Sequence, residues 1–219
     1  MADGGAADRR AVPSLMLEDP AAPAVVLASA SPSRRALLRN AGLQVACEAA
    51  RIDEDEVKAS LKAEGAAPER VAETLAELKA QRVSRRHAGA LVIGADQMLD
   101  CNGIWFDKPT DLTHAAAHLR ALSGREHRLI SALCVVQDGT RLWHHIEDAR
   151  LVVRPLSESF IADYLDAVGE AALTSVGAYQ LEGPGAQLFS RIEGDYFTIL
   201  GLPLLPLLDF LRHHKVVAR

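Results

Sequence analysis

Two serines and two arginines follow a short apolar segment near the start of the chain and form the first candidate site. Residues 24–28 are all apolar, and Ser29, Ser31, Arg34 and Arg35 come soon after them. A strand that leads into a helix presents free backbone N–H groups and the positive end of the helix dipole. Arginines in the first turn oppose that dipole, so a bound anion such as phosphate would account for them. The alternative is an ordinary capped helix with solvated arginines.

Carboxylates supply the second set of candidates. Asp96 follows the apolar segment 91–95, where we expect a strand to end, and open α/β sheets bind ligands at that edge. A carboxylate there can hold Mg²⁺ or act as a general base. The acidic run 53–56, which we expect to be a loop, would complete a metal site with Asp96. The structural alternatives are a strand-ending turn at Asp96 and a solvated acidic loop.

Other catalytic patterns are missing from the sequence. The eight histidines include no HExxH motif, and there is no GxGxxG or Walker phosphate loop. Cys47, Cys101 and Cys134 are far apart and odd in number, which favours free thiols in a reducing compartment over disulfide bonds. Lys79 and Lys108 indicate no chemistry when each is taken alone.

The elements that must position these residues alternate between strands and helices, with two hairpins inserted. This order favours a mixed sheet flanked by helices over a purely parallel sheet. The Gly-containing segment 170–189 is expected to be irregular. We expect strands over 24–28, 43–47 and 91–96, hairpin turns at 102–103 and 138–139, and helices over 32–42, 68–87, 112–122 and 157–168 with a final helix ending near 213.

The overall composition is that of a globular protein, and it excludes some classes of binding partner. The chain has 219 residues, of which 49% are apolar and 24% charged, and these values exclude collagen, low-complexity disorder and a disulfide scaffold. A net charge of −5 argues against nucleic acid as a partner, because nonspecific binding to it needs a basic surface. No apolar segment is long enough for a membrane span, and the start has no signal-peptide core. We therefore expect a cytoplasmic protein that binds neither nucleic acid nor membrane.

Composition also predicts the domain boundaries. Residues 1–23 are rich in Ala, Gly, Asp and Pro, which is typical of a disordered N-terminal extension. We expect one domain over residues 24–213 and a C-terminal tail over 214–219.

Taken jointly, the motifs resemble those of the Maf family of nucleoside triphosphate pyrophosphatases. The resemblance begins with LASASPSRR at 27–35 and covers about residues 25–212. Further matching segments follow in order: LKA at 78–80, IGADQ at 93–97, KP at 108–109, LSGR at 122–125, GAYQLEG at 177–183, IEGDY at 192–196 and LGLPL at 200–204.

The resemblance implies a fold and a reaction. The fold is a two-lobed α/β structure, similar to inosine triphosphatases, in which helices flank a bent mixed sheet and a cleft separates the lobes. The reaction is divalent-metal-dependent hydrolysis of a nucleoside triphosphate between its α and β phosphates, with Mg, Mn or Co as the metal. Family members are often homodimers and are described as house-cleaning enzymes that act on modified nucleotides.

The resemblance also assigns roles to individual residues. Asp96 matches the family's catalytic carboxylate and would act as the general base, and Glu54 matches an acidic residue that helps Asp96 to hold the metal. Phosphoryl chemistry of this kind depends mainly on positioning and charge neutralisation. The positions that match phosphate-binding residues are Ser29, Arg34, Lys79 and Lys108.

Three further positions concern the nucleobase. Ser33, Gln97 and Glu182 stand where the dTTP/UTP branch of the family has Arg, Thr and Gln. The branch similar to 7-methyl-GTP pyrophosphatases has Gln and Glu at the last two positions, as here, but often Trp in place of Ser33. A carboxylate accepts hydrogen bonds from N1–H and the amino group of guanine and favours a cationic methylated base. We expect a guanine-type or modified nucleotide as the substrate; the alternatives are a dTTP/UTP pyrophosphatase and a non-catalytic regulator of cell division.

Overall fold

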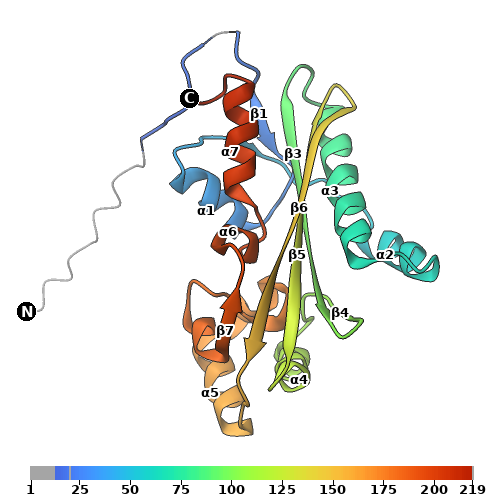
Figure 1. Cartoon of the computed structure of the whole chain (residues 1–219), viewed down its shortest axis with the longest axis vertical. Helices are drawn as coiled ribbons and strands as arrows, with labels where there is room; N and C mark the ends of the chain where they lie inside the picture. The colour runs from blue at the N-terminus through green and yellow to red at the C-terminus, as the bar shows by residue number, and fades with distance from the viewer. Residues whose placement is uncertain (1–12, 20, 219) are drawn as a thin grey trace, which may run out of the picture.

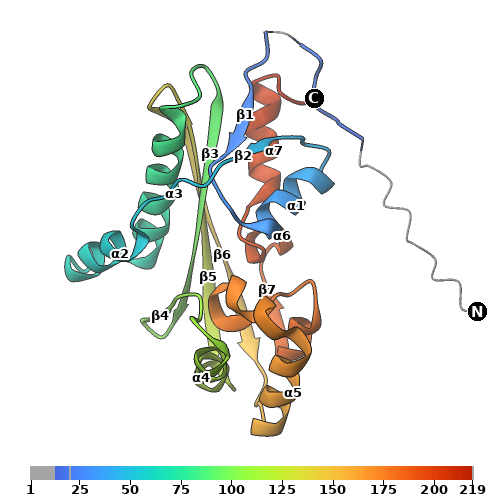
Figure 2. The same ribbon diagram turned by 180° about the vertical axis from the view of Figure 1, so that it is seen from behind.

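The computed structural model describes residues 13–19 and 21–218 and contains a long, twisted, mixed sheet (Figures 1 and 2). The strands are β1 (Val25–Leu27), β2 (Ala46–Cys47), β3 (Leu91–Cys101), β4 (Ile104–Phe106), β5 (Glu126–Gln137), β6 (Thr140–Val153) and β7 (Phe189–Glu193). Their order across the sheet is β2-β1-β3-β5-β6-β7, and β4 pairs with β3. The pairs β1–β2 and β1–β3 are parallel and the other pairs are antiparallel, so the predicted mixed sheet is confirmed.

Helices flank this sheet (Figures 1 and 2). They are α1 (Pro32–Asn40), α2 (Glu54–Ala63), α3 (Pro68–Ser84), α4 (Leu112–Leu122), α5 (Glu158–Val168), α6 (Tyr196–Ile199) and α7 (Leu204–His213), with 3-10 turns η1 (Gly169–Thr174), η2 (Val176–Ala178) and η3 (Pro184–Leu188). In one half of the sheet, α3 packs on one face and α1 and α7 cover the other. In the other half, α4, α5 and the 3-10 turns enclose a further core. None of the helices among the described residues has the length and apolar composition that crossing a membrane requires.

Local signals in the sequence account for several of these elements. Ser31 begins α1, and its Oγ accepts a hydrogen bond from the backbone N–H of Arg34. Asn102 has a φ of 54° between β3 and β4, and Asp138 has a φ of 49° between β5 and β6. Both belong to the two-residue turns that the Asn-Gly and Asp-Gly pairs predict, so both hairpins are confirmed.

The prediction of a loop over residues 53–56 is wrong, because this run begins α2. The Oδ1 atom of Asp53 accepts a hydrogen bond of 3.0 Å from the N–H of Glu56 and so caps the helix. The carboxylates of the first turn lie at the positive end of the helix dipole, which stabilises them there. No residue of α2 is buried, so the helix lacks the clear apolar pattern that would have predicted it.

The strand β3 continues past its predicted end at Asp96. Antiparallel pairing with β5 extends from Val92 to Asp100, and this pairing carries the strand on to Cys101. Asp96 therefore lies in the middle of a strand. On the other edge of β3, β1 pairs only with residues 91–93 and β4 only with 99–101, so within the described chain no strand covers the edge between them.

The two ends of the described chain meet on the folded body. Met16 forms an antiparallel bridge with Val217, and Val217 is buried. Met16 falls within the predicted extension over 1–23, and Val217 falls within the predicted tail over 214–219. Residues 1–12, which make up the first part of the predicted extension, lie outside the described residues.

The three cysteines are free thiols. Cys101 and Cys134 are buried, and burial raises the pKa of Cys134 to about 12. The Cys134 thiol is therefore protonated at neutral pH, and its place in the apolar core is structural.

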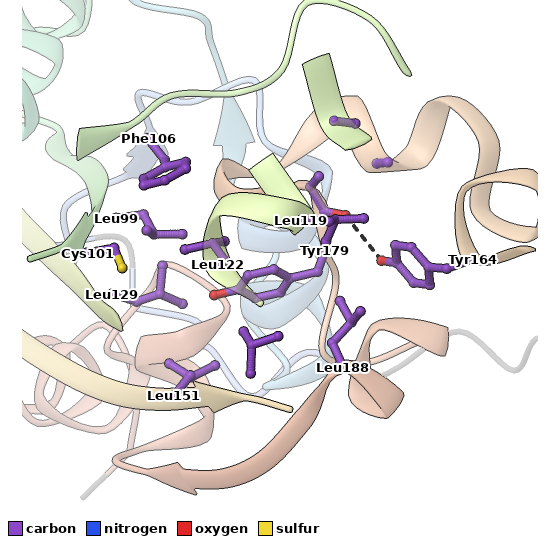
Figure 3. Close-up of a cluster of buried hydrophobic side chains, with 14 of the residues drawn as sticks. Leu99, Cys101, Phe106, Leu119, Leu122, Leu129, Leu151, Tyr164, Tyr179 and Leu188 are labelled. Atoms are coloured by element: carbon purple, nitrogen blue, oxygen red, sulfur yellow. Dashed lines mark hydrogen bonds between the residues drawn. The ribbon is translucent and has the colours of Figure 1, made fainter. Parts of the chain in front are cut away.

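The core between α4, α5 and the sheet supports the segment that follows η1 (Figure 3). Leu99 and Leu129 from the strands pack in one cluster with Leu122 of α4. The Tyr164 hydroxyl on α5 donates a hydrogen bond of 3.2 Å to the carbonyl oxygen of Ala178. This contact fixes η2 against the core.

The helix α3 approaches β3 closely at Gly94. A Cβ atom placed on Gly94 would lie 1.9 Å from the carbonyl oxygen of Ala76 and 2.9 Å from the Cβ of Ala80. No side chain fits into that space, because both neighbours belong to the buried core beneath α3. Glycine at this position therefore lets α3 lie against the strand.

We expect Gly94→Ala to push α3 away from β3 and to lower the free energy of unfolding by about 3 kcal/mol, as overpacking against a backbone atom does. Urea unfolding followed by circular dichroism measures this change. Gly183→Ala is the matched control, because a Cβ there meets its nearest neighbour only at 3.9 Å. Equal unfolding free energies for Gly94→Ala and the wild type would contradict the packing argument.

Candidate active site

A cleft of about 370 Å³ opens beside the uncovered edge of β3. Its walls come from α1, α2, α3, β3, α6, the segment after β4 and the segment around η2. Most of the residues that the sequence singled out lie here together. Its charged lining residues are Arg34, Lys58, Lys79 and Lys108, with the carboxylates Glu54, Asp55, Asp96, Asp107 and Glu182.

An ion cluster occupies the inner part of the cleft. The Lys79 ammonium lies 2.6 Å from Oδ1 of Asp96 and 2.9 Å from Oε1 of Glu54. The Asp96 side chain is only 6% exposed, whereas that of Glu54 is 42% exposed. Lys79 therefore joins a buried carboxylate on β3 to a more accessible one at the start of α2.

The second oxygen of Asp96 is free. Its Oδ2 atom is buried and has no hydrogen-bond partner among the described residues. Burial raises the pKa of Asp96, although Lys79 and Arg34 act in the opposite direction. An unpaired buried carboxylate oxygen is costly unless a ligand or water uses it, so Oδ2 is the clearest candidate for a reactive group.

Arg34 is held by backbone carbonyls at the uncovered edge of β3. Its Nη1 atom donates to the Ala95 oxygen at 2.9 Å, and its Nε atom donates to the Gly201 oxygen at 2.8 Å. Nη1 also lies 3.4 Å from Oγ of Ser29, which is buried behind the arginine. Arg34 thus links α1, β3 and the turn after α6, and Nη2 is left without a protein partner among the described residues.

Two more lysines extend the cationic part of the cleft. Burial lowers the pKa of Lys108, and Arg34 and Lys79 lower it further by repulsion. Lys58 projects from α2 and its Nζ atom lies 2.5 Å from Oδ1 of Asp107. Sequence reasoning missed Lys58; its spacing of four residues from Glu54 would have placed both on one helical face.

Gln97 has a fixed orientation on the side of the cleft away from Lys79. Its Nε2 atom donates to Oγ of Ser131 at 3.0 Å and to the carbonyl oxygens of Thr198 and Ile199 at 3.1 and 3.0 Å. These three acceptors assign the amide orientation, so Oε1 is the atom that Gln97 can offer to a ligand as an acceptor.

Ser33 and Glu182 meet across the mouth of the cleft. Oγ of Ser33 on α1 lies 3.5 Å from Oε1 of Glu182, which follows η2. The structure therefore brings together the three residues expected to face the nucleobase, since Gln97 lines the same cleft. Ser29 is not among the lining residues and contacts the cleft through Arg34.

The carboxylates of Glu54 and Asp96 fit a hard divalent cation that also binds oxygen atoms of a ligand. Within the described residues, no cluster of three His, Cys, Asp or Glu side chains forms a complete metal site. Glu54 and Asp96 both contact Lys79, which places two carboxylates near each other. Mg²⁺ is commonly bound by one or two carboxylates together with water and substrate phosphates, so these residues fit such an ion.

The cleft thus places a buried carboxylate beside cations from α1, α2, α3 and the segment after β4. The chain belongs to the Maf family. The model of this family, described as Maf-like protein, matches residues 24–214. The predicted family is therefore confirmed.

Named relatives cover nearly the same part of the chain. The nucleoside triphosphate pyrophosphatase of Paramagnetospirillum magneticum is 59% identical over 189 residues, which are 86% of this chain and 97% of the relative. The 7-methyl-GTP pyrophosphatases of Rhizobium johnstonii and Rhizobium meliloti are 58% and 57% identical over 190 residues, which are 87% of this chain and 96% of each relative. This chain is thus similar both to enzymes named nucleoside triphosphate pyrophosphatase and to enzymes named 7-methyl-GTP pyrophosphatase.

A buried histidine supports the floor of the cleft. Nε2 of His127 on β5 lies 2.6 Å from the hydroxyl of Tyr179, which lines the cleft. Burial lowers the pKa of His127 to about 4, so the ring is neutral at pH 7. A histidine in the unfolded chain has a pKa near 6.5, so below that pH the unfolded state binds the extra proton.

We therefore expect stability to fall as the pH falls from about 6.5 to 4, and His127 to contribute up to about 3 kcal/mol of that loss. Urea unfolding at several pH values measures the slope. His127→Gln keeps an amide near the Tyr179 hydroxyl but does not titrate, so its slope should be shallower than that of the wild type. Identical slopes would show that His127 is not the group responsible.

Proposed function

We propose that this cleft hydrolyses nucleoside triphosphates between the α and β phosphates and releases a nucleoside monophosphate and pyrophosphate. The observation that carries the proposal is the buried Asp96, whose Oδ2 atom is free while Oδ1 is held by Lys79. Membership of the Maf family and the names of the relatives support the same reaction class. Asp100 also has a buried oxygen without a partner, but only Asp96 of the two lines the cleft, where a water and a substrate could reach it.

In this proposal the cations of the cleft position the phosphates. Nη2 of Arg34 and the ammonium of Lys108 bind phosphate oxygens, and Ser29 keeps Arg34 in place through their mutual contact. Lys79 binds at the reacting phosphate and at the same time orients Asp96. Cations fixed in advance stabilise the charge that develops on phosphate oxygens in the transition state.

Asp96 activates the attacking water. Its Oδ2 atom accepts a proton from the water while the water oxygen forms a bond to the α phosphorus, and the bond to the bridging oxygen breaks as pyrophosphate leaves. A carboxylate whose pKa is raised by burial is a better proton acceptor than one in water. The hydrogen bond from Lys79 holds the carboxylate in the orientation that this transfer needs.

Charge in the cleft supports a metal requirement. Five carboxylates and four cationic side chains line the cleft, so a triphosphate brings negative charge that these side chains alone do not neutralise. Glu54 and Asp96 would hold a divalent cation such as Mg²⁺, Mn²⁺ or Co²⁺ together with phosphate oxygens. Such an ion, when bound, neutralises phosphate charge and lowers the pKa of its water.

The acceptors at the other end of the cleft support a guanine-type base. Gln97 can offer Oε1, because its Nε2 atom is used by the protein, and Glu182 offers a carboxylate. Guanine has adjacent donors at N1–H and its amino group, and a methylated guanine is also cationic, so both features match these acceptors. We therefore propose 7-methyl-GTP or a similar guanine nucleotide as the preferred substrate, ahead of dTTP and UTP.

We expect Asp96→Asn to reduce turnover by about a thousandfold, because the amide cannot accept the proton of the attacking water. The fold and the nucleotide affinity should be retained. Pyrophosphate release, thermal melting and calorimetric nucleotide binding measure the three properties. Asp100→Asn is the matched control, since it makes the same change on the same strand away from the cleft lining. Pyrophosphate release by Asp96→Asn at the wild-type rate would overturn the role of Asp96.

A substrate screen tests the metal and the base together. Pyrophosphate release should be fastest with 7-methyl-GTP or GTP, should need Mg²⁺, Mn²⁺ or Co²⁺, and should stop on chelation and return on metal addition. Glu182→Gln should shift the ratio of guanine-nucleotide to dTTP turnover by about tenfold toward dTTP, since it removes a charged acceptor. A clear dTTP or UTP preference of the wild type would refute the base assignment.

A further inference from the structure

Lys58 is a cation of the cleft that the mechanism above does not use. Its side chain is only 18% exposed, although lysines at protein surfaces are usually well solvated. It lies one helical turn after Glu54, so both side chains are on the same face of α2 and both line the cleft. In this structure its Nζ atom is paired with Asp107, the residue next to Lys108.

The pair with Asp107 is one of several contacts that α2 makes. One turn further along the helix, the ammonium of Lys62 lies 5.1 Å from the centre of the Trp105 ring. Val57 and Leu61 of the same helix pack against the core beneath α3. The ion pair of Lys58 is therefore not the sole link between α2 and the rest of the described chain.

The surroundings of Lys58 keep its ammonium group charged and allow it to leave Asp107 for another anion. Burial works against its charge, but Asp107, Asp96 and Glu54 outweigh burial and raise its pKa. The Asp107 side chain is 57% exposed, so water can solvate that carboxylate when the lysine leaves it. The partners of Lys58 include none of the residues at the base end of the cleft.

We infer that Lys58 binds the β and γ phosphates of the substrate, the part that leaves as pyrophosphate, by exchanging Asp107 for phosphate oxygens. This inference rests on the proposed function. Ser33 and Glu182 mark the base end and Asp96 marks the reacting phosphate, so the segment with Asp107 and Lys58 remains for the rest of the triphosphate chain. Asp107 then acts as a competitor that neutralises the lysine while no substrate is bound.

The two members of the pair make opposite predictions, and this separates a binding role from a structural one. Lys58→Met should weaken the binding of inorganic pyrophosphate about tenfold, because a charge-assisted contact is lost. Asp107→Asn should strengthen pyrophosphate binding, because it removes the competing carboxylate. Neither substitution should change the affinity for the nucleoside monophosphate, which lacks the β and γ phosphates.

Isothermal titration calorimetry with pyrophosphate and with GMP, in the presence of Mg²⁺, measures these affinities for the full-length protein. Glu56→Met is the matched control, since it removes a charge from an exposed position of the same helix without touching the cleft lining, and its pyrophosphate affinity should equal that of the wild type. Thermal melting verifies that each variant is folded.

Three outcomes would overturn the inference: equal pyrophosphate affinity for Lys58→Met and the wild type, a loss of affinity for both Lys58→Met and Asp107→Asn, or an equal loss for pyrophosphate and GMP. The second outcome would mean that the ion pair only supports the fold. Failure of the proposed function looks different, because then the wild type would release no pyrophosphate from any nucleoside triphosphate whatever the Lys58 and Asp107 variants do.

Discussion

The site depends on the close contact between α3 and β3 at Gly94. The missing side chain lets the helix lie against the strand, and the helix carries Lys79 while the strand carries Asp96. Their 2.6 Å contact is therefore fixed by the packing of backbone against backbone. The cost of burying two charged groups is met by their mutual pairing and by Glu54, and it leaves one carboxylate oxygen available for chemistry.

An interruption in strand pairing determines where that chemistry is accessible. Since β1 and β4 cover only the two ends of one edge of β3, the middle of that edge opens into the cleft. Arg34 occupies part of the gap by donating to the Ala95 carbonyl, as a neighbouring strand would. A residue predicted to bind phosphate thus also completes the sheet, which ties substrate binding to the integrity of the fold.

The sequence predicted the features that depend on local interactions. Ser31 and Pro32 begin α1, and Asn102-Gly103 forms a hairpin turn, because a few neighbouring residues decide these conformations. The continuation of β3 past Asp96 depends on pairing with β5, which lies far away along the chain. The helix α2 and the pair between Lys58 and Asp107 also escaped prediction, since no apolar periodicity or known motif marks them.

The lack of buried residues in α2 has a consequence for the energetics of the cleft. An element that covers little apolar surface can open by local unfolding without the rest of the molecule, and its backbone amides should exchange hydrogen faster than those of α3. Each opening would withdraw Glu54 and Lys58 from the cleft. The free energy that holds α2 in place is therefore separate from the free energy of global folding. A ligand that contacts both α2 and the rest of the cleft would stabilise the closed position of α2 by thermodynamic linkage.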